Sequence, residues 1–266
     1  MTSLTLSEVN VYPVKSLRGI SVDQWSVGAR GLHMDRELML VDDTGRFVTQ
    51  REEHRMALVA TELAGDDLVL RAPGAPPLVI SLAARSAERL AISIWKDSLD
   101  AEPVGAAADA WLSRVLDRPV RLVRFAVDVH RQVDLRFARA GDAVGFADGF
   151  SLLLTTEASL ADLALRVGQP LSMARFRPNL VVRGASPYAE DGWRRLRIGP
   201  IEVELVKPCA RCVITTIDPV TSEAGHEPLR TLARHRNAGG KVLFGWNGVH
   251  RGTGVLQVGD PVEIIA

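Results

Sequence analysis

The sequence predicts a β-rich α+β protein in which an antiparallel, barrel-like N-terminal domain precedes a second β-barrel domain with a few short helices. Two observations support this fold class. Up to about residue 100 the apolar residues fall in short and often alternating runs, and helical spacing is scarce. Turn signals separate these runs, namely Thr44-Gly45, Gly65-Asp66 and Ala75-Pro76-Pro77.

The first half of the chain supplies the expected strands of the N-terminal domain. Their apolar residues are Leu4 and Leu6, Val9 and Val11, Leu38 with Leu40 and Val41, Phe47-Val48, Leu68 and Leu70, Val79-Ile80, and Ile92 and Ile94. In residues 105–117 the apolar positions recur at helical spacing, which predicts a helix that Pro119 ends. We therefore expect a boundary near residue 120, with domains at 1–120 and 121–266.

The second half mixes strands and helices. We expect strands at 151–155 and 176–182, a helix at 157–167, a hairpin of 196–198 with 201–206, a short helix at 227–236, and a last hairpin of 255–258 with 262–265. Residues 213–217 read VITTI, which is too β-branched for a helix and predicts a strand.

Composition excludes several classes of function. Lys and Arg together number 32, as do Asp and Glu, so no overall field attracts a nucleic acid. No apolar stretch is long enough to span a membrane, and the alternating N-terminus lacks a signal-peptide core. We expect a soluble, cytoplasmic protein. Only four of the 32 basic residues are lysines, and guanidinium is the better bidentate partner for phosphate.

Two cysteines, Cys209 and Cys212, are the only ones in the chain. A zinc site would need two more ligands, and His226 and His235 are too far apart in sequence for the usual spacing. A thioredoxin-like pair should open a helix, whereas this pair runs into a β-branched segment. One thiolate suffices for a soft transition metal, and the neighbouring Arg211 would favour its ionised form. Two structural thiols in a turn also fit the pattern.

A string of motifs resembles the MOSC family. The core motif is KPCARCVITTIDP at residues 207–219, followed by EPLRTL at 227–232. Matches in the same order are YPVKS at 12–16, Asp35-Arg36, FRPN at 176–179, Phe244-Gly245 and VGDPV at 258–262. The chain is thus similar to the amidoxime-reducing components and their bacterial relatives, in which an N-terminal β-barrel precedes the MOSC domain.

The resemblance implies a site for the molybdenum cofactor, Mo-molybdopterin, between the two domains. Cys212 would bind molybdenum, and Asp218 could relay protons near it. The other residues carried over as cofactor contacts are Lys15, Ser16, Arg36, Asp148, Gly149, Arg177, Asn179, Arg211 and Asn247. Taken alone, Lys15 also fits a solvated lysine at a strand end, and Asp218 also fits a turn residue before Pro219.

The implied activity is the reduction of N-hydroxylated substrates such as amidoximes and hydroxylamines, by removal of oxygen at molybdenum. Two cysteines cannot supply the four ligands of an iron–sulfur cluster, and no dinucleotide-binding fingerprint is present. We therefore expect a separate electron donor, a ferredoxin or cytochrome with its own reductase. Two alternatives remain: a carrier of the cofactor or of its sulfur, without turnover, and a small-molecule binding module with structural cysteines.

Overall fold

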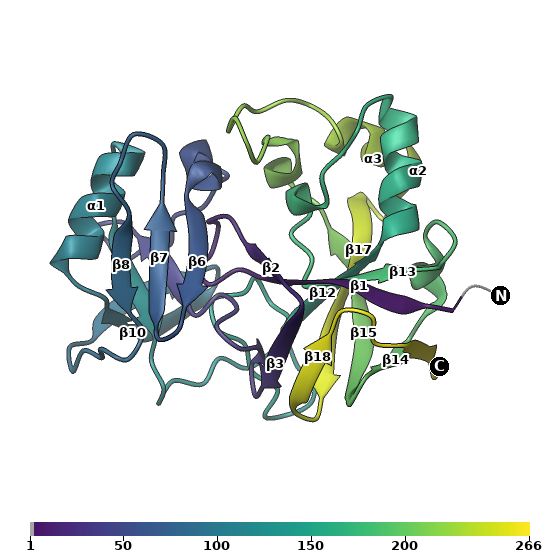
Figure 1. Ribbon diagram of the computed structural model, residues 1–266, viewed down its shortest axis with the longest axis horizontal. Helices are drawn as coiled ribbons and strands as arrows, with labels where there is room; N and C mark the ends of the chain where they lie inside the picture. The colour runs from purple at the N-terminus through teal and green to yellow at the C-terminus, as the bar shows by residue number, and fades with distance from the viewer. Residues whose placement is uncertain (1–2) are drawn as a thin grey trace.

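The computed structural model describes residues 3–266, which form two lobes that lie side by side (Figure 1). The small lobe, residues 38–125, contains two sheets, one α-helix and the 3-10 helix His54–Leu58. Its four-stranded sheet has the order β5-β11-β10-β9, and its three-stranded sheet has the order β6-β7-β8. The elements are β5 (Leu38–Val41), β6 (Ala60–Ala64), β7 (Asp67–Arg71), β8 (Leu78–Ser81), β9 (Leu90–Ile94), β10 (Asp97–Pro103), α1 (Ala106–Leu116) and β11 (Arg121–Phe125).

Strand β5 shows why the small lobe needs two sheets. All four of its residues are buried, rather than every second one. Leu38 and Leu40 pack in one core cluster with Trp111 of α1, whereas Met39 and Val41 pack in another with Phe146. Both faces of the four-stranded sheet are therefore covered, and a strand covered on both faces has a continuous apolar sequence.

The large lobe, residues 5–32 and 152–264, is built on a nine-stranded sheet with the order β19-β14-β15-β17-β12-β13-β1-β2, to which β16 is added beside β17. A three-stranded sheet, β18-β3-β4, lies with it. Its strands are β1 (Thr5–Val11), β2 (Ile20–Val22), β3 (Gln24–Gly28), β4 (Gly31–Leu32), β12 (Leu152–Thr156), β13 (Leu180–Arg183), β14 (Arg195–Ile198), β15 (Ile201–Ala210), β16 (Asn237–Ala238), β17 (Lys241–Arg251), β18 (Gly254–Gln257) and β19 (Val262–Ile264). The helices of this lobe are α2 (Glu157–Val167) and α3 (Leu229–His235).

The nine-stranded sheet closes on itself as a barrel. The amide of Leu6 in β1 donates to the carbonyl of Asp260 at 2.9 Å, and the amide of Val262 donates to the carbonyl of Leu4 at 2.9 Å. Val262 is also the first residue of β19, which pairs with β14 at the other end of the sheet. The enclosed space holds a cluster of buried apolar side chains from β1, β12, β13, β14 and β15. This confirms the predicted β-rich fold class.

The chain passes through the junction of the lobes at residues 12–19, between β1 and β2, and again at residues 33–37, between β4 and β5, and it returns to the large lobe after β11. Strand β1 pairs with β13 in the large lobe, while β11 pairs with β5 and β10 in the small lobe. The boundary expected near residue 120 falls between α1 and β11 and stays a prediction. The first two passages through the junction lie side by side, since Val14 and Leu38 form a parallel bridge.

Three sequence expectations for local structure were wrong. Residues 213–216 form a 3-10 turn rather than a strand. The hydroxyl of Thr215 donates to the carbonyl of Cys212 at 3.0 Å, and that of Thr216 donates to the carbonyl of Val213 at 2.7 Å. These bonds back along the chain stabilise a turn despite the β-branched side chains. The strand expected at 176–182 begins only at Leu180, because Arg177 has a left-handed backbone.

The expected hairpin of 255–258 with 262–265 does not form either. Strand β18 pairs with β3, and β19 pairs with β14. The turn between them is held by β1 instead, since the amide of Gly259 donates to the carbonyl of Leu6 at 2.8 Å. Within residues 3–266, no helix is both long and apolar enough to cross a membrane.

Candidate functional site

A cavity of about 190 Å³ lies where the two lobes meet. Ten of the eleven site residues expected from the sequence line it: Lys15, Ser16, Arg36, Asp148, Gly149, Arg177, Asn179, Arg211, Cys212 and Asn247. They come from the segments between β1 and β2 and between β4 and β5, the segments before β12 and before β13, the residues just after β15, and β17. Residues far apart in the sequence therefore converge because the chain passes repeatedly through the junction.

Lys15 is buried at one side of the cavity. Its ammonium group donates to the carbonyl of Phe146 at 2.8 Å and forms an ion pair with Asp148. Burial lowers the pKa of Lys15, an effect that Asp148 opposes. Lys15 is thus a buried cation with a single carboxylate partner, whose own side chain is 58% exposed.

Arg51 and Trp95 surround Asp148, and the sequence analysis assigned a role to neither. Arg51 lies 3.5 Å from the Asp148 carboxylate, and the indole of Trp95 donates to it at 3.2 Å. The Arg51 guanidinium also lies 4.8 Å from the centroid of a Trp95 ring. Trp95 is 48% exposed, so its indole lies outside the core. Its left-handed backbone, with φ of 56°, is visible only in the structure.

Arg36 is held in place by its neighbours on three sides. One guanidinium nitrogen lies 2.5 Å from Asp35 and 3.1 Å from the side-chain oxygen of Asn179, and the other donates to the carbonyl of Arg177 at 3.2 Å. The Asn179 oxygen also accepts from the amide of Leu153 at 3.1 Å, and its nitrogen donates to the carbonyl of Asn10 at 3.2 Å. Both polar atoms of the Asn179 side chain therefore have hydrogen-bond partners within the protein, and Asn179 orients Arg36.

Tyr12 lies beneath both arginines. The guanidiniums of Arg36 and Arg177 lie 4.2 and 4.3 Å from the centroid of its ring. Its hydroxyl donates to the carbonyl of Pro178 at 3.1 Å. Burial raises the pKa of Tyr12 to about 12 and lowers that of Arg177 to about 10. At neutral pH the phenol is therefore protonated and Arg177 is charged.

Three residues of the cavity wall have left-handed backbones that are unfavourable for side-chain-bearing residues. Their φ angles are 67° at Ser16, 51° at Arg36 and 54° at Arg177. Each costs about 1–2 kcal/mol relative to the right-handed conformation. Such strain concentrates at functional sites, where the surrounding structure holds a side chain in a required direction.

The two cysteines occupy different surroundings at the end of β15. Arg211 donates to the sulfur of Cys209 at 2.9 Å and to the carbonyl of Phe176 at 2.5 Å, so it contacts Cys209 rather than the Cys212 sulfur. Its Nε is buried and, within residues 3–266, has no hydrogen-bond partner. Cys212 lines the cavity at the start of the 3-10 turn. Asn247 faces this region from β17, with its amide nitrogen 3.3 Å from the carbonyl of Lys207.

Asp218 does not line this cavity. Its carboxylate lies 2.6 Å from Arg175 and accepts hydrogen bonds from the amides of Val220 and Thr221 at 2.8 and 3.1 Å. The Val220 hydrogen bond, together with that of Thr221 and the charge of Arg175, lowers the pKa of Asp218. Asp218 is thus an ionised turn residue that shapes the segment after Cys212.

The fold and the site together define a class of protein. Five cationic side chains line the cavity, and Asp148 is the one carboxylate among its lining residues. The cations are Lys15, Arg36, Arg51, Arg177 and Arg211. The result is a two-lobed β protein with an anion-binding cavity next to an accessible thiol, that of Cys212. Such a site suits a phosphate-bearing ligand that also presents a thiophilic atom.

Comparisons with known proteins give the family. The model of the MOSC N-terminal beta barrel domain matches residues 3–119, and that of the MOSC domain matches residues 141–263. The chain belongs to the family of proteins that combine these two domains. It is 32% identical over 281 residues to mitochondrial amidoxime-reducing component 1 of Homo sapiens, covering 98% of this chain and 83% of that protein. It is 34% identical over 276 residues to mitochondrial amidoxime reducing component 2 of Bos taurus, covering 97% and 82%.

Proposed function

We propose that this protein is a molybdenum-cofactor-dependent oxidoreductase that reduces N-hydroxylated compounds such as amidoximes and hydroxylamines. The observation that carries the proposal is the cationic cavity into which Cys212 opens, lined by residues from both lobes. The names of the relatives support the substrate class, since they describe amidoxime-reducing components.

The residues present fit the cofactor. Its phosphate is an anion, and Lys15, Ser16, Arg36 and Arg177 would hold it and the pterin through charge-assisted hydrogen bonds. The buried Arg211 Nε without a partner is a further donor next to the site. Cys212 would bind the metal through its sulfur, because a thiolate suits a soft transition metal. When bound, the molybdenum cofactor supplies the two-electron oxygen-removal chemistry that protein side chains lack.

The protein's own contribution is placement and charge. In the overall reaction an amidoxime, two electrons and two protons give an amidine and water. Arg36 and Arg177 are fixed by Tyr12, Asp35 and Asn179, so they need no rearrangement when an anion binds. Asp218 is excluded from direct proton transfer in this proposal, because its carboxylate is occupied by Arg175 and two amides.

The electron donor is proposed to be a separate redox protein, a ferredoxin or a cytochrome with its own reductase. The chain has two cysteines, fewer than the four ligands that an iron–sulfur cluster requires. This count supports a source of the two electrons outside the chain.

The test is to express the protein in a host that makes molybdenum cofactor and to measure molybdenum and pterin content alongside benzamidoxime reduction by reduced viologen. We expect near-equimolar metal and pterin, turnover, and loss of both on Cys212→Ala. Cys209→Ala is the matched control and should retain most of the metal, because one thiolate suffices. Equal losses at both positions would favour a dithiol site. Cofactor without turnover would favour a carrier, and folded protein with neither metal nor pterin would refute the proposal.

A further inference from the structure

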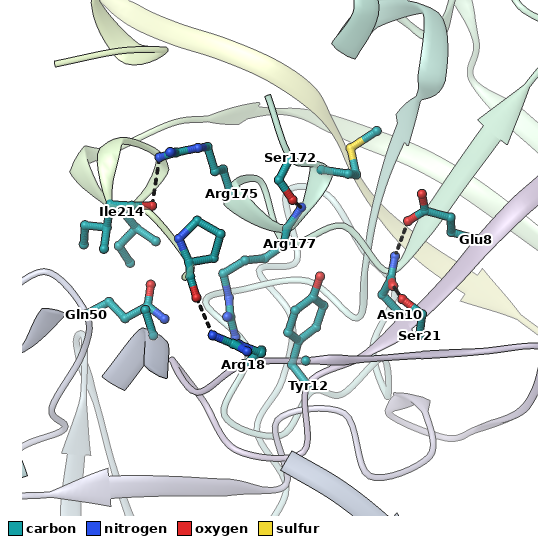
Figure 2. Close-up of a pocket in the computed structure, with 16 residues that line it drawn as sticks. Glu8, Asn10, Tyr12, Arg18, Ser21, Gln50, Ser172, Arg175, Arg177 and Ile214 are labelled. Carbon is teal, nitrogen blue, oxygen red and sulfur yellow. Dashed lines mark hydrogen bonds between the residues drawn. The ribbon is translucent and has the colours of Figure 1, made fainter. Parts of the chain in front are cut away.

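A second cavity, of about 260 Å³, adjoins the cofactor cavity and is shown in Figure 2. The two cavities share Arg177 and Ile214 in their walls. On one side the second cavity is lined by Glu8 and Asn10, which alternate along β1, and by Tyr12 just after that strand. The 3-10 turn that follows Cys212, and the residues just after it, form another part of its wall.

One part of this cavity is rich in positive charge. Arg18 and Arg177 both line it, and neither forms an ion pair within residues 3–266. Arg18 donates to the carbonyl of Pro219 at 2.6 Å, and Arg177 donates to that of Leu17 at 2.7 Å. Because a guanidinium has five N–H donors, each retains donors for a ligand. Arg175 adds no net charge, since it pairs with Asp218.

The opposite part of the cavity offers acceptors. Figure 2 shows Glu8, Asn10 and Ser21 grouped beyond Tyr12, away from Arg18. Ser21 donates to the side-chain oxygen of Asn10 at 2.5 Å, and Asn10 donates to one carboxylate oxygen of Glu8 at 3.0 Å. The other Glu8 oxygen has no hydrogen-bond partner among residues 3–266, and no cation there pairs with this carboxylate.

We propose that this second cavity is a binding site for a small carboxylate that also carries an amino or hydroxyl group. The carboxylate faces Arg18 and Arg177, and the donor group faces Glu8. Charge of both signs at separate parts of one cavity excludes a simple cation, which Arg18 and Arg177 repel, and disfavours a polyanion, which Glu8 repels. The site does not rest on the redox proposal, because it needs no metal and neither cysteine, although it shares Arg177 with the first cavity.

The test is isothermal titration calorimetry of the purified protein with three probes: 4-(aminomethyl)benzoate, benzoate and benzamidine. We expect saturable binding of 4-(aminomethyl)benzoate, weaker binding of benzoate, and none of benzamidine. Arg18→Gln should weaken binding of 4-(aminomethyl)benzoate at least tenfold, and Arg18→Lys should restore part of the loss. Arg71→Gln, at an exposed arginine outside the cavity, should have no effect.

Two further variants test whether the probe binds in this cavity rather than in the neighbouring one, and whether a loss of binding reflects a folding defect. Glu8→Gln should weaken the binding of 4-(aminomethyl)benzoate but leave benzoate bound equally well or more tightly, because it removes a negative charge. A variant whose site is unfolded would instead lose the binding of both probes. Lys15→Ala, which alters only the cofactor cavity, should leave probe binding unchanged. The proposal would be overturned if 4-(aminomethyl)benzoate did not bind or if benzamidine bound more tightly than it. Loss of 4-(aminomethyl)benzoate binding in Lys15→Ala, or unchanged binding in Arg18→Gln, would also overturn it.

Discussion

The Lys15 ammonium group and the Asp148 carboxylate, 133 residues apart in sequence, form an ion pair at the junction of the lobes. The lysine side chain is 6% exposed and the aspartate 58%. Desolvation opposes ionisation of Asp148, but Lys15 and Arg51 outweigh it and hold the pKa of Asp148 below its ordinary value of 3.8. The pair therefore joins the segment after β1 to the segment before β12, and Arg51 and Trp95 of the small lobe contact the same carboxylate.

Asp148→Asn should lower the free energy of unfolding at pH 7 by about 1 kcal/mol, a value limited by solvent screening at the exposed carboxylate. Because the folded-state pKa of Asp148 is depressed, the stabilisation is present above pH 3.8 and is lost as the pH falls below it. Urea denaturation at several pH values measures this. Asp128→Asn, at an exposed acid paired with Arg89, should change stability by less than about 0.5 kcal/mol. Equal effects of the two variants would contradict the prediction.

Tyr12 should be required for orienting Arg36 and Arg177. Tyr12→Leu removes the ring that both guanidiniums contact, an interaction worth about 0.5–2 kcal/mol each, so pterin content should fall several-fold. Tyr12→Phe keeps the ring and loses only the hydrogen bond to Pro178, so it should retain most of the pterin. Pterin released per folded protein is the measurement. Equal retention in the Leu and Phe variants would show that the ring is not what positions the arginines.

Because Arg177 has a left-handed backbone, two substitutions there should differ in their effect on protein stability but not in their effect on cofactor binding. Arg177→Gly and Arg177→Ala both remove the guanidinium, but glycine adopts φ of 54° without strain. The free energy of unfolding of the glycine variant should therefore be about 1 kcal/mol higher than that of the alanine variant. Both should lose cofactor to the same extent, because a charge-assisted hydrogen bond is worth about 2 kcal/mol. Thermal denaturation and pterin content test the two halves, and better cofactor retention with glycine would argue against a direct role of the guanidinium.

Glu190 is a buried carboxyl group without a cationic partner among residues 3–266. It accepts hydrogen bonds from Ser159 at 2.8 Å and Thr156 at 3.2 Å, and burial raises its pKa above the ordinary 4.5. A raised folded-state pKa means that stability falls as the pH rises above 4.5. Glu190→Gln should remove this loss and stabilise the protein by on the order of 1 kcal/mol at pH 8, with little change near pH 4.5. Melting temperatures at the two pH values test it, with exposed Glu88→Gln as the control. A variant less stable at pH 8 would contradict the prediction.

Most elements with strong local signals were predictable from the sequence. The helices near residues 106–116 and 157–167 and the hairpin around Gly199-Pro200 form as expected, because apolar spacing and turn residues act locally. The turn after Cys212 was not predictable from β-branching, since the threonine hydroxyls bond back to the main chain. The pairing of β18 and β19 was also beyond local reasoning, because their partners are β3 and β14.

The sequence by itself determined the β-rich fold class, the family, and ten of the residues that line the cavity between the lobes, because these depend on residue type and order along the chain. Only the tertiary structure decided that Asp218 lies outside that cavity and that Arg51 and Trp95 surround Asp148. It also decided that Arg211 contacts Cys209. The physical reason is that hydrogen bonds and ion pairs depend on distances between side chains, and the crossing of the chain between the lobes sets those distances.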